Sequence, residues 1–181
     1  QLLFYLPLAG TAFKKVYYDP NKQRAVSTFV PVEDLVVPYT ASDLETCERV
    51  THVVKMTYNE IRTQQLAGFY RDIPLQAAET SIGSETEDKE DELQGLSSTS
   101  NDMMYELLEC HVSMDLPGFE DPDGYHLPFI ITIDKASNEV LSIRRNYNPN
   151  DPLRTKIQYF VHYKFLPGLG FYGFGLIHMI G

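Results

Sequence analysis

The sequence from Val50 to Tyr70, VTHVVKMTYNEIRTQQLAGFY, predicts a strand that leads directly into a helix. Side chains on a strand point alternately to its two faces, so residues two apart share a face. In Val50–Met56 the residues that share one face are Val50, His52, Val54 and Met56. The other face would carry Thr51, Val53 and Lys55.

The helix that follows has a start signal and a stop signal. Thr57 and Glu60 form a T-x-x-E capping box, in which each side chain accepts a hydrogen bond from a backbone N–H that the helix start leaves unpaired. Gly68 supplies the stop, because glycine adopts the left-handed conformation at a helix end without steric cost. These signals predict a helix over 58–68.

Composition limits the classes of protein to consider. With 181 residues, 43% of them hydrophobic, the chain suits one domain, and it has no apolar run long enough to cross a membrane. The net charge of −10 argues against general nucleic-acid binding, which depends on Lys and Arg. Two cysteines, Cys47 and Cys110, are expected to be free thiols. The start at Gln1 carries no signal-peptide features, and we expect an internal fragment of a longer protein.

Alternation and turn residues predict a fold rich in strands. The expected strands are Leu2–Leu8, Ala12–Tyr18, Ala25–Val32, Leu35–Val37 as a short edge strand, Val50–Met56, Leu108–Leu116, Phe129–Asp134, Glu139–Arg145 and Ile157–Phe165. In Leu108–Leu116 we expect the even-numbered, apolar residues to face the core and the odd-numbered ones to face water. Ser42 and Glu45 predict a second capping box that opens a short helical turn through Cys47. The fold class is therefore α+β, with a mainly antiparallel sheet and few helices.

An acidic segment interrupts this pattern. Between Glu79 and Glu92 there are seven acidic residues against Lys89, and residues 77–101 contain almost no large apolar side chains. Such a segment cannot bury enough surface to offset its ordering entropy, so we expect a disordered insertion or linker. We expect one domain formed by residues 1–76 and 102–181, with this insertion between them. The first part contains the capped helix, and the second ends in a Gly-rich hydrophobic segment.

Two motifs have a plain structural interpretation. Gly168–Gly173 matches G-x-G-x-x-G, but the downstream strand and acidic residue of a dinucleotide site have no room to follow, so we expect the glycines to permit a sharp turn and close packing. Asp121-Pro122-Asp123-Gly124 contains part of a calcium loop but lacks its remaining ligands, and a turn between strands explains it better.

The cysteines and histidines show no catalytic or metal-binding spacing. Cys110 and His111 are adjacent on a predicted strand and would point to opposite faces. A cysteine-dependent enzyme would require the fold to bring a distant histidine to Cys47 or Cys110. We therefore assign no catalytic, cofactor-binding or metal-binding residues, expect no cofactor, and do not expect an enzyme.

Several segments resemble one family, the portal proteins of tailed double-stranded DNA bacteriophages, in particular the large portals of short-tailed phages. The segments that carry the resemblance are Leu6–Asp19, Val32–Tyr39, Arg49–His52, Ala67–Arg71, Ser142–Tyr147, His162–Gly168 and Phe171–Gly175. They cover most of the chain outside the acidic segment, and none of them is a catalytic signature.

The resemblance implies a structural, non-enzymatic subunit, from the wing-like outer region, of a ring of about twelve copies at one capsid vertex. Double-stranded DNA would pass through the channel without sequence-specific binding, and a separate terminase would supply ATP hydrolysis. Expected partners are neighbouring subunits, the terminase, capsid or scaffold proteins and head-completion proteins, with no membrane. The location would be the portal vertex of the virion, which is assembled in the bacterial host cytoplasm and can be encoded by a prophage.

The basic residues and the hydrophobic end of the chain are the predicted contact elements of such a subunit. The basic residues are Lys14, Lys15, Arg144, Arg145 and Lys164. We expect them to lie at the surface or at subunit contacts rather than to contact DNA. Phe171–Ile180 would pack against other portions of the chain or an adjacent subunit. The alternative function is a monomeric β-rich module that binds a protein or glycan through its twelve tyrosines.

Overall fold

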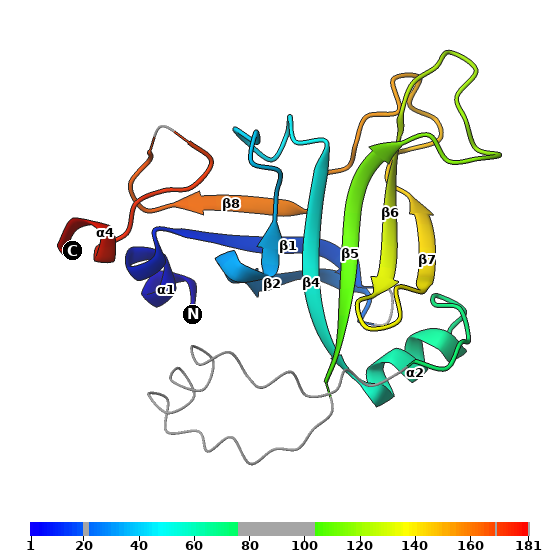
Figure 1. The fold of residues 1–181 in the computed structure, drawn as a ribbon, viewed down its shortest axis with the longest axis horizontal. Coiled ribbons are helices and arrows are strands. Elements are labelled where there is room, and N and C mark those ends of the chain that lie inside the picture. Colours follow the sequence, from blue (N-terminus) through cyan, green and yellow to red (C-terminus); the bar gives the residue numbers. More distant parts are fainter. Residues whose placement is uncertain (20–21, 76–103, 169, 181) are drawn as a thin grey trace. The chain divides into compact units, whose positions relative to one another are not determined.

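The computed structural model describes residues 1–19, 22–75, 104–168 and 170–180, and it forms two antiparallel sheets with short helices (Figure 1). The elements are α1 (Leu2–Ala9), β1 (Thr11–Asp19), β2 (Arg24–Val30), η1 (Val32–Asp34), β3 (Leu35–Val36), β4 (Arg49–Thr57), α2 (Tyr58–Leu66), β5 (Met104–Met114), β6 (Leu127–Asp134), β7 (Val140–Arg145), β8 (Phe160–Lys164) and α4 (Ile177–Ile180). This confirms the α+β class with mainly antiparallel strands. The expected acidic insertion, 77–101, lies outside the described residues.

The three-stranded sheet has the order β2-β1-β8. β1 pairs antiparallel with β2, with Phe13 opposite Val30, and also antiparallel with β8, with Phe13 opposite His162. The predicted strand Ile157–Phe165 is therefore shorter in the structure and is confined to Phe160–Lys164. This sheet brings the beginning and the end of the described chain together.

The five-stranded sheet has the order β3-β4-β5-β6-β7. Its edge strand β3 has only two residues, as Pro31 and Pro38 on either side predict, because proline removes a backbone donor. The hairpin between β6 and β7 closes at residues 135–138, where Asp134 accepts hydrogen bonds from the backbone and hydroxyl of Ser137 and Asn138 has a positive φ of 59°. The predicted hairpin loop is confirmed.

The chain divides into two compact units, each with its own core. One unit comprises Gln1–His52, Cys110–Ile130 and Arg144–Gly181, and its buried cluster is Phe13, Val30, Leu35, Leu44, Cys47, Val50, Phe160 and Phe171. The other comprises Val53–Glu109 and Ile131–Ile143, and its buried cluster is Ile61, Tyr105, Leu107 and Leu141, with Val54 and Met56 packed against it.

Helix α2 begins as its sequence predicts. The Thr57 hydroxyl oxygen accepts from the Glu60 backbone N–H at 3.4 Å, and a Glu60 carboxylate oxygen accepts from the Thr57 N–H at 2.8 Å, so the capping box is complete. The helix ends at Leu66, and Gly68 follows with a left-handed φ of 72°. Both signals are confirmed, with the regular helix two residues shorter than predicted.

The predicted first strand, Leu2–Leu8, is wrong, because these residues form helix α1. The helix ends where Gly10 takes a positive φ of 81° and donates its N–H to the Leu6 carbonyl. Its polar side-chain anchor is Tyr5, whose hydroxyl donates to Glu33 and whose ring packs edge-on against Phe29. A run of uniformly apolar residues has no period, so sequence alone could not distinguish helix from strand here.

The predicted helical turn at Ser42–Cys47 is also wrong. Residues 44–46 form a turn, and the side chain that caps it is Asp43, which accepts from the Thr46 N–H at 2.7 Å. This hydrogen bond lowers the pKa of Asp43 below its usual value. Lys156 then holds the turn from outside by donating to the carbonyls of Leu44, Glu45 and Cys47 at 3.2, 3.3 and 2.7 Å.

The predicted faces of the Leu108–Leu116 strand are reversed. Strand β5 runs over Met104–Met114, and the buried residues are the odd-numbered ones: Tyr105, Leu107, Glu109 and His111. Cys110, expected in the core, is only half-buried. The reason is non-local, because His111 packs against the rings of Tyr159 and Phe160, and Tyr105 and Leu107 belong to the core of the other unit.

Candidate interaction surface

Three glycines join the α1–β1 turn to the C-terminal segment through direct backbone contact. A Cβ atom on Gly173 would lie 2.6 Å from the Gly10 carbonyl oxygen, and one on Gly175 would lie 2.6 Å from the Gly10 nitrogen and closer still to the Leu8 carbonyl oxygen. Distances this short are excluded for real side chains, so the two backbones pack closely only because glycine stands at these positions. We call Gly10, Gly173 and Gly175 the glycine junction.

Hydrogen bonds fasten the junction on both sides. The Leu176 N–H donates to the Pro7 carbonyl at 2.7 Å, and the buried Thr11 hydroxyl accepts from the Gly173 N–H at 2.8 Å. The predicted role of the G-x-G-x-x-G glycines in close packing is thus confirmed for Gly173. Gly168 lies against the Phe174 ring, whereas Gly170 has open space around it, and Leu169 is outside the described residues.

Three rings pack together where β1, β8 and the C-terminal segment meet, and we call Phe13, His162 and Phe171 the ring stack. The His162 ring centroid is 4.7 Å from both the Phe13 and the Phe171 centroids, and those two centroids are 6.0 Å apart, so each ring contacts the other two. Burial, together with the smaller effect of the nearby Lys164 charge, lowers the pKa of His162 to about 4. The neutral imidazole therefore serves as a packing group that ties β8 to the C-terminal segment.

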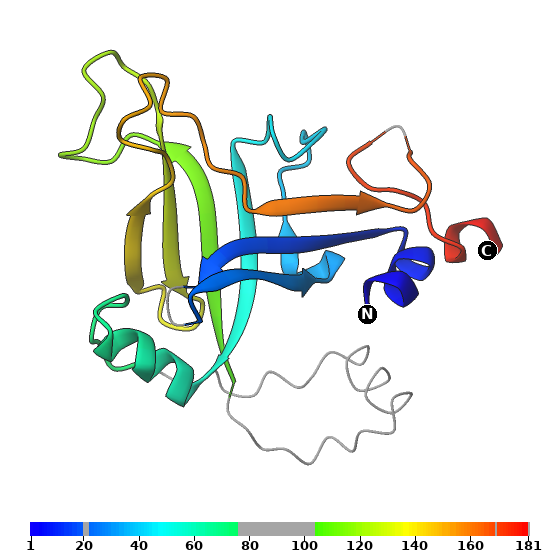
Figure 2. The ribbon, with the colours of Figure 1, turned by 180° about the vertical axis from the view of Figure 1, so that it is seen from behind.

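The junction supports an exposed apolar surface made by α1 and the segment up to α4. These two elements lie side by side in both views (Figures 1 and 2), and the Leu176–Pro7 hydrogen bond links them. The exposed residues that form the α1–α4 surface are Leu3, Phe4, Leu8, Tyr172, Phe174, Leu176, Ile177, Met179 and Ile180. Leu3 is 89% exposed and Ile180 is 84% exposed, values that are costly for large apolar side chains in water.

The sequence indicates the C-terminal half of this surface but not the α1 half. The sequence predicts that Phe171–Ile180 packs against other protein. Phe171 packs in the core of its own unit, whereas the large residues from Tyr172 to Ile180 are exposed. The α1 half was missed, because a strand at Leu2–Leu8 would have paired within the sheet. The signal that could have found it is Gly10, which follows an apolar run at the position of a helix stop.

The basic residues singled out in the sequence lie on three strands: Lys14 and Lys15 on β1, Arg144 and Arg145 on β7, and Lys164 on β8. Lys14 and Lys15 are neighbours on β1 and point to opposite faces. The Lys15 ammonium lies 5.6 Å from the Tyr17 ring centroid and 6.0 Å from that of Phe160, while Lys164 donates to the Gly170 carbonyl. These two cations are therefore engaged within the chain.

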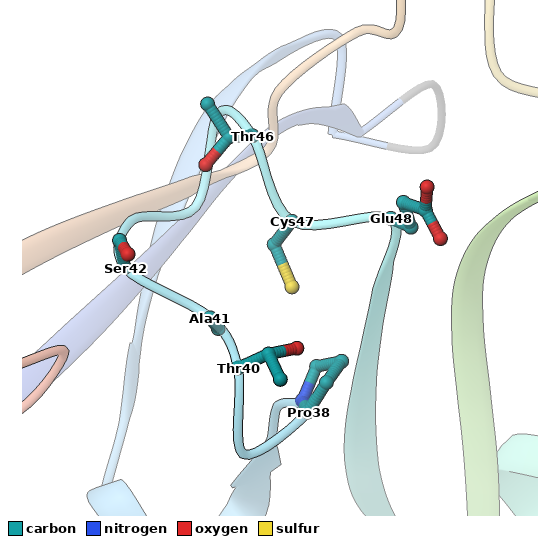
Figure 3. Close-up of a pocket in the computed structure, with 7 residues that line it drawn as sticks. All are labelled: Pro38, Thr40, Ala41, Ser42, Thr46, Cys47 and Glu48. Carbon is teal, nitrogen blue, oxygen red and sulfur yellow. The ribbon is translucent and has the colours of Figure 1, made fainter.

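A small pocket surrounds Cys47 (Figure 3). It has a volume of about 360 Å³ and is lined by Pro38, Thr40, Ala41, Ser42, Thr46, Cys47 and Glu48. The Cys47 thiol points toward Pro38 and Thr40, and it donates to the Arg49 carbonyl at 2.9 Å. None of the pocket residues is a histidine, so this pocket does not supply the Cys–His pair that a cysteine-dependent enzyme would need.

The remaining sequence motifs take structural positions. Cys110 accepts a weak hydrogen bond from the Thr51 hydroxyl at 3.7 Å, and both cysteines are free. Asp121–Gly124 forms the predicted turn, with the Gly124 N–H donating to the Asp121 carbonyl and a Gly124 φ of 77°. Among the described residues, no group of three His, Cys, Asp or Glu side chains is placed to hold a metal ion.

The chain was compared with protein-family models and with curated protein sequences. No protein-family model matches the chain, and no curated protein sequence is significantly similar to it. Of the helices in the described part of the chain, none has the length and apolar character needed to cross a membrane. Function must therefore be argued from the α1–α4 surface.

Proposed function

We propose that the chain is a structural assembly subunit that uses its α1–α4 surface to contact other protein, and that the assembly is a phage portal ring for genome packaging and ejection. The observation that supports assembly is the concentration of exposed large apolar residues on two adjoining elements. Gatherings of exposed apolar residues favour protein–protein contact, because burying them removes apolar area from water. The portal assignment comes from the resemblance of the sequence segments.

The way the surface is built also supports this proposal. The Leu176–Pro7 backbone hydrogen bond fixes the C-terminal segment against α1, and the Gly173–Thr11 hydrogen bond and the ring stack fix it against β1 and β8. A surface held in place before binding loses little conformational freedom when the partner arrives, so more of its burial free energy appears as affinity. In a ring the contacts are head-to-tail, so this surface would meet a different surface on the neighbouring copy.

The charge agrees with a channel component. A net charge of −10 disfavours adhesion to the phosphates of DNA, which a conduit for moving DNA must avoid. The proposed partners are neighbouring subunits first, then the terminase, capsid or scaffold and head-completion proteins. The proposed place is the portal vertex of the virion.

Native mass spectrometry tests the proposal. We expect this chain, or the longer protein if the gene encodes one, to form one uniform closed ring, and the double variant Phe4→Ser/Ile177→Ser to lower the ring fraction at least tenfold. Leu66→Ser is the matched control, because Leu66 is 75% exposed on α2, outside this surface. Monomers at every concentration, from both the chain and the full-length protein, would refute the assembly function.

One observation favours the alternative, a monomeric module that binds protein or glycan. Tyr39 is fully exposed in the loop after β3, and an exposed tyrosine offers a rigid, amphipathic contact group. A specific ligand that raises the melting temperature of a monomeric wild-type chain, but not of Tyr39→Ala, would support this alternative.

A further inference from the structure

A second surface, unrelated to the α1–α4 surface, is built by the two loops 115–126 and 146–157. The first loop connects β5 to β6, the second connects β7 to β8, and they lie side by side in both views (Figures 1 and 2). An ion pair joins them, with the Arg154 guanidinium against the Asp121 carboxylate, whose side chain is 1% exposed. Leaving a buried carboxylate without its cation is costly, so the pair fixes the loops to each other.

Side-chain caps hold the backbone of each loop. Asp121 accepts from the Asp123 N–H at 2.8 Å, and Asp151 accepts from the Leu153 and Thr155 N–H groups at 3.0 and 2.9 Å. The base of the second loop is closed by the Ile157 N–H, which donates to the Asn146 carbonyl. These bonds replace the flexibility expected of long loops with a fixed arrangement.

The fixed loops present large apolar side chains to water. Leu153 is 81% exposed, Tyr125 67% and Phe119 54%. Leu153 precedes Arg154 by one residue and Phe119 precedes Asp121 by two, so the ion pair brings these two stretches of the loops together. Apolar anchors on a preorganised backbone are the usual centre of a protein-binding surface.

The charge around these anchors selects the type of partner. The two loops carry five carboxylates, Asp115, Glu120, Asp121, Asp123 and Asp151, against two basic side chains, Arg154 and Lys156. Arg154 is engaged by Asp121 and Lys156 by three backbone carbonyls, while Asp115 lies 3.3 Å from His126, so acidic groups exceed the cations free to balance them. Nucleic acid and anionic lipid would both be repelled by such a rim. A protein segment that carries Lys or Arg beside apolar side chains complements both the anchors and the rim.

We propose that the surface made by loops 115–126 and 146–157 is a docking site for a basic, apolar segment of a partner protein. The apolar side chains of that segment pack on Phe119, Tyr125 and Leu153, and its cations lie against the surrounding carboxylates. The site is independent of assembly through α1 and α4, so it can exist whether or not the chain forms a ring.

The test uses a yeast-displayed library of random short peptides, selected on the wild-type chain. We expect enriched peptides that combine Lys or Arg with large apolar residues, bind at least tenfold more weakly to Phe119→Ser/Leu153→Ser, and lose affinity as salt rises. Leu66→Ser is the control and should bind as wild type does. Both variants leave the Asp121–Arg154 pair intact, and unchanged circular dichroism verifies their folding.

A second variant separates the charge contribution from the apolar one. Glu120→Lys/Asp123→Lys retains the anchors and reverses two rim charges, so we expect it to bind the same peptides at least tenfold more weakly. The proposal is overturned if no peptide is enriched, if enriched peptides bind all variants equally, or if wild type instead binds vesicles of anionic phospholipid. Ring formation is measured in parallel by native mass spectrometry. Peptide binding reports on the loop surface and ring formation on the assembly function, so failure of one proposal can be distinguished from failure of the other.

Discussion

Replacing Gly175 with alanine tests the glycine junction directly. The added Cβ would lie 2.6 Å from the Gly10 nitrogen and nearer to the Leu8 carbonyl oxygen, and both atoms belong to backbone that cannot rotate away. Overpacking of this kind costs about 1–3 kcal/mol. Moving the segment aside instead breaks the Leu176–Pro7 hydrogen bond and the buried one from the Gly173 N–H to the Thr11 hydroxyl, and each buried group left unpaired costs about 1–3 kcal/mol.

We therefore expect Gly175→Ala to destabilise the protein by about 3 kcal/mol, or to detach residues 173–180 locally. For a chain of this length that lowers the melting temperature by roughly 6–12 °C. Gly170→Ala is the control, because its Cβ would meet nothing within 4 Å. Both substitutions reduce the entropy of the unfolded chain equally, so their difference isolates the steric contact.

Thermal unfolding measures the global cost, and hydrogen exchange at the Leu176 amide detects local detachment. The expected result is a lower melting temperature or faster exchange in Gly175→Ala alone. Equal melting temperatures within about 1 °C, together with unchanged exchange in both variants, would refute the close backbone approach.

Three further predictions concern the cores and the ring stack. Leu107→Ala should cost about 2–5 kcal/mol of unfolding free energy and Leu108→Ala about 1 kcal/mol or less, because of the two only Leu107 is fully buried. Urea titrations measure both costs. A larger cost for Leu108→Ala would show that the even-numbered face of β5 is the buried one, as the sequence predicts. Lys156→Met removes three hydrogen bonds to the carbonyls of the turn beside Cys47, so it should lower the unfolding free energy by about 2 kcal/mol. The loosened turn should also let the Cys47 thiol react faster with a disulfide reagent. An unchanged reaction rate would contradict the role of Lys156 in holding this turn. The folded-state pKa of His162, about 4, is below the unfolded value of 6.5, so the unfolded chain binds more protons and stability falls as pH drops from about 6.5 to about 4. His162→Phe keeps the ring stack and should flatten that loss in acid unfolding curves, whereas a slope identical to wild type would exclude the imidazole as its cause.

Local signals in the sequence were sufficient wherever the residues that decide a structure are close in the chain. Thr57 and Glu60 form the capping box three residues apart, and Gly124 completes a turn that starts at Asp121. In each case the side chain satisfies a backbone group next to it, so no distant partner is needed.

Prediction failed where distant residues decide the structure. The faces of β5 follow the rings of Tyr159 and Phe160 that meet His111, and these rings lie almost fifty residues away. Both faces of β5 carry residues that can be buried, so the alternation fixes the period of the strand but not which face turns inward. The local sequence of β5 therefore does not determine which of its faces is buried.

The interaction surface was predictable in part for the same reasons. The packing role of the glycines follows from their spacing and from the bulky residues between them, which argue against a phosphate site. The exposed face of α1 does not, because its helix is specified by a single stop signal at Gly10 and by Tyr5 reaching Glu33. Its partner segment, Phe174–Ile180, is about 165 residues away in the sequence.

The pairing of β1 with β8 has a consequence for synthesis on the ribosome. Phe13 must wait for His162, which is made roughly 150 residues later, or about 7–30 s at ordinary elongation rates. During that time the β1–β2 hairpin can form, but its inner face and the apolar helix ahead of it have no cover. The nascent chain is therefore a substrate for chaperones that hold apolar segments, and translation speed near β8 should set how long it stays bound.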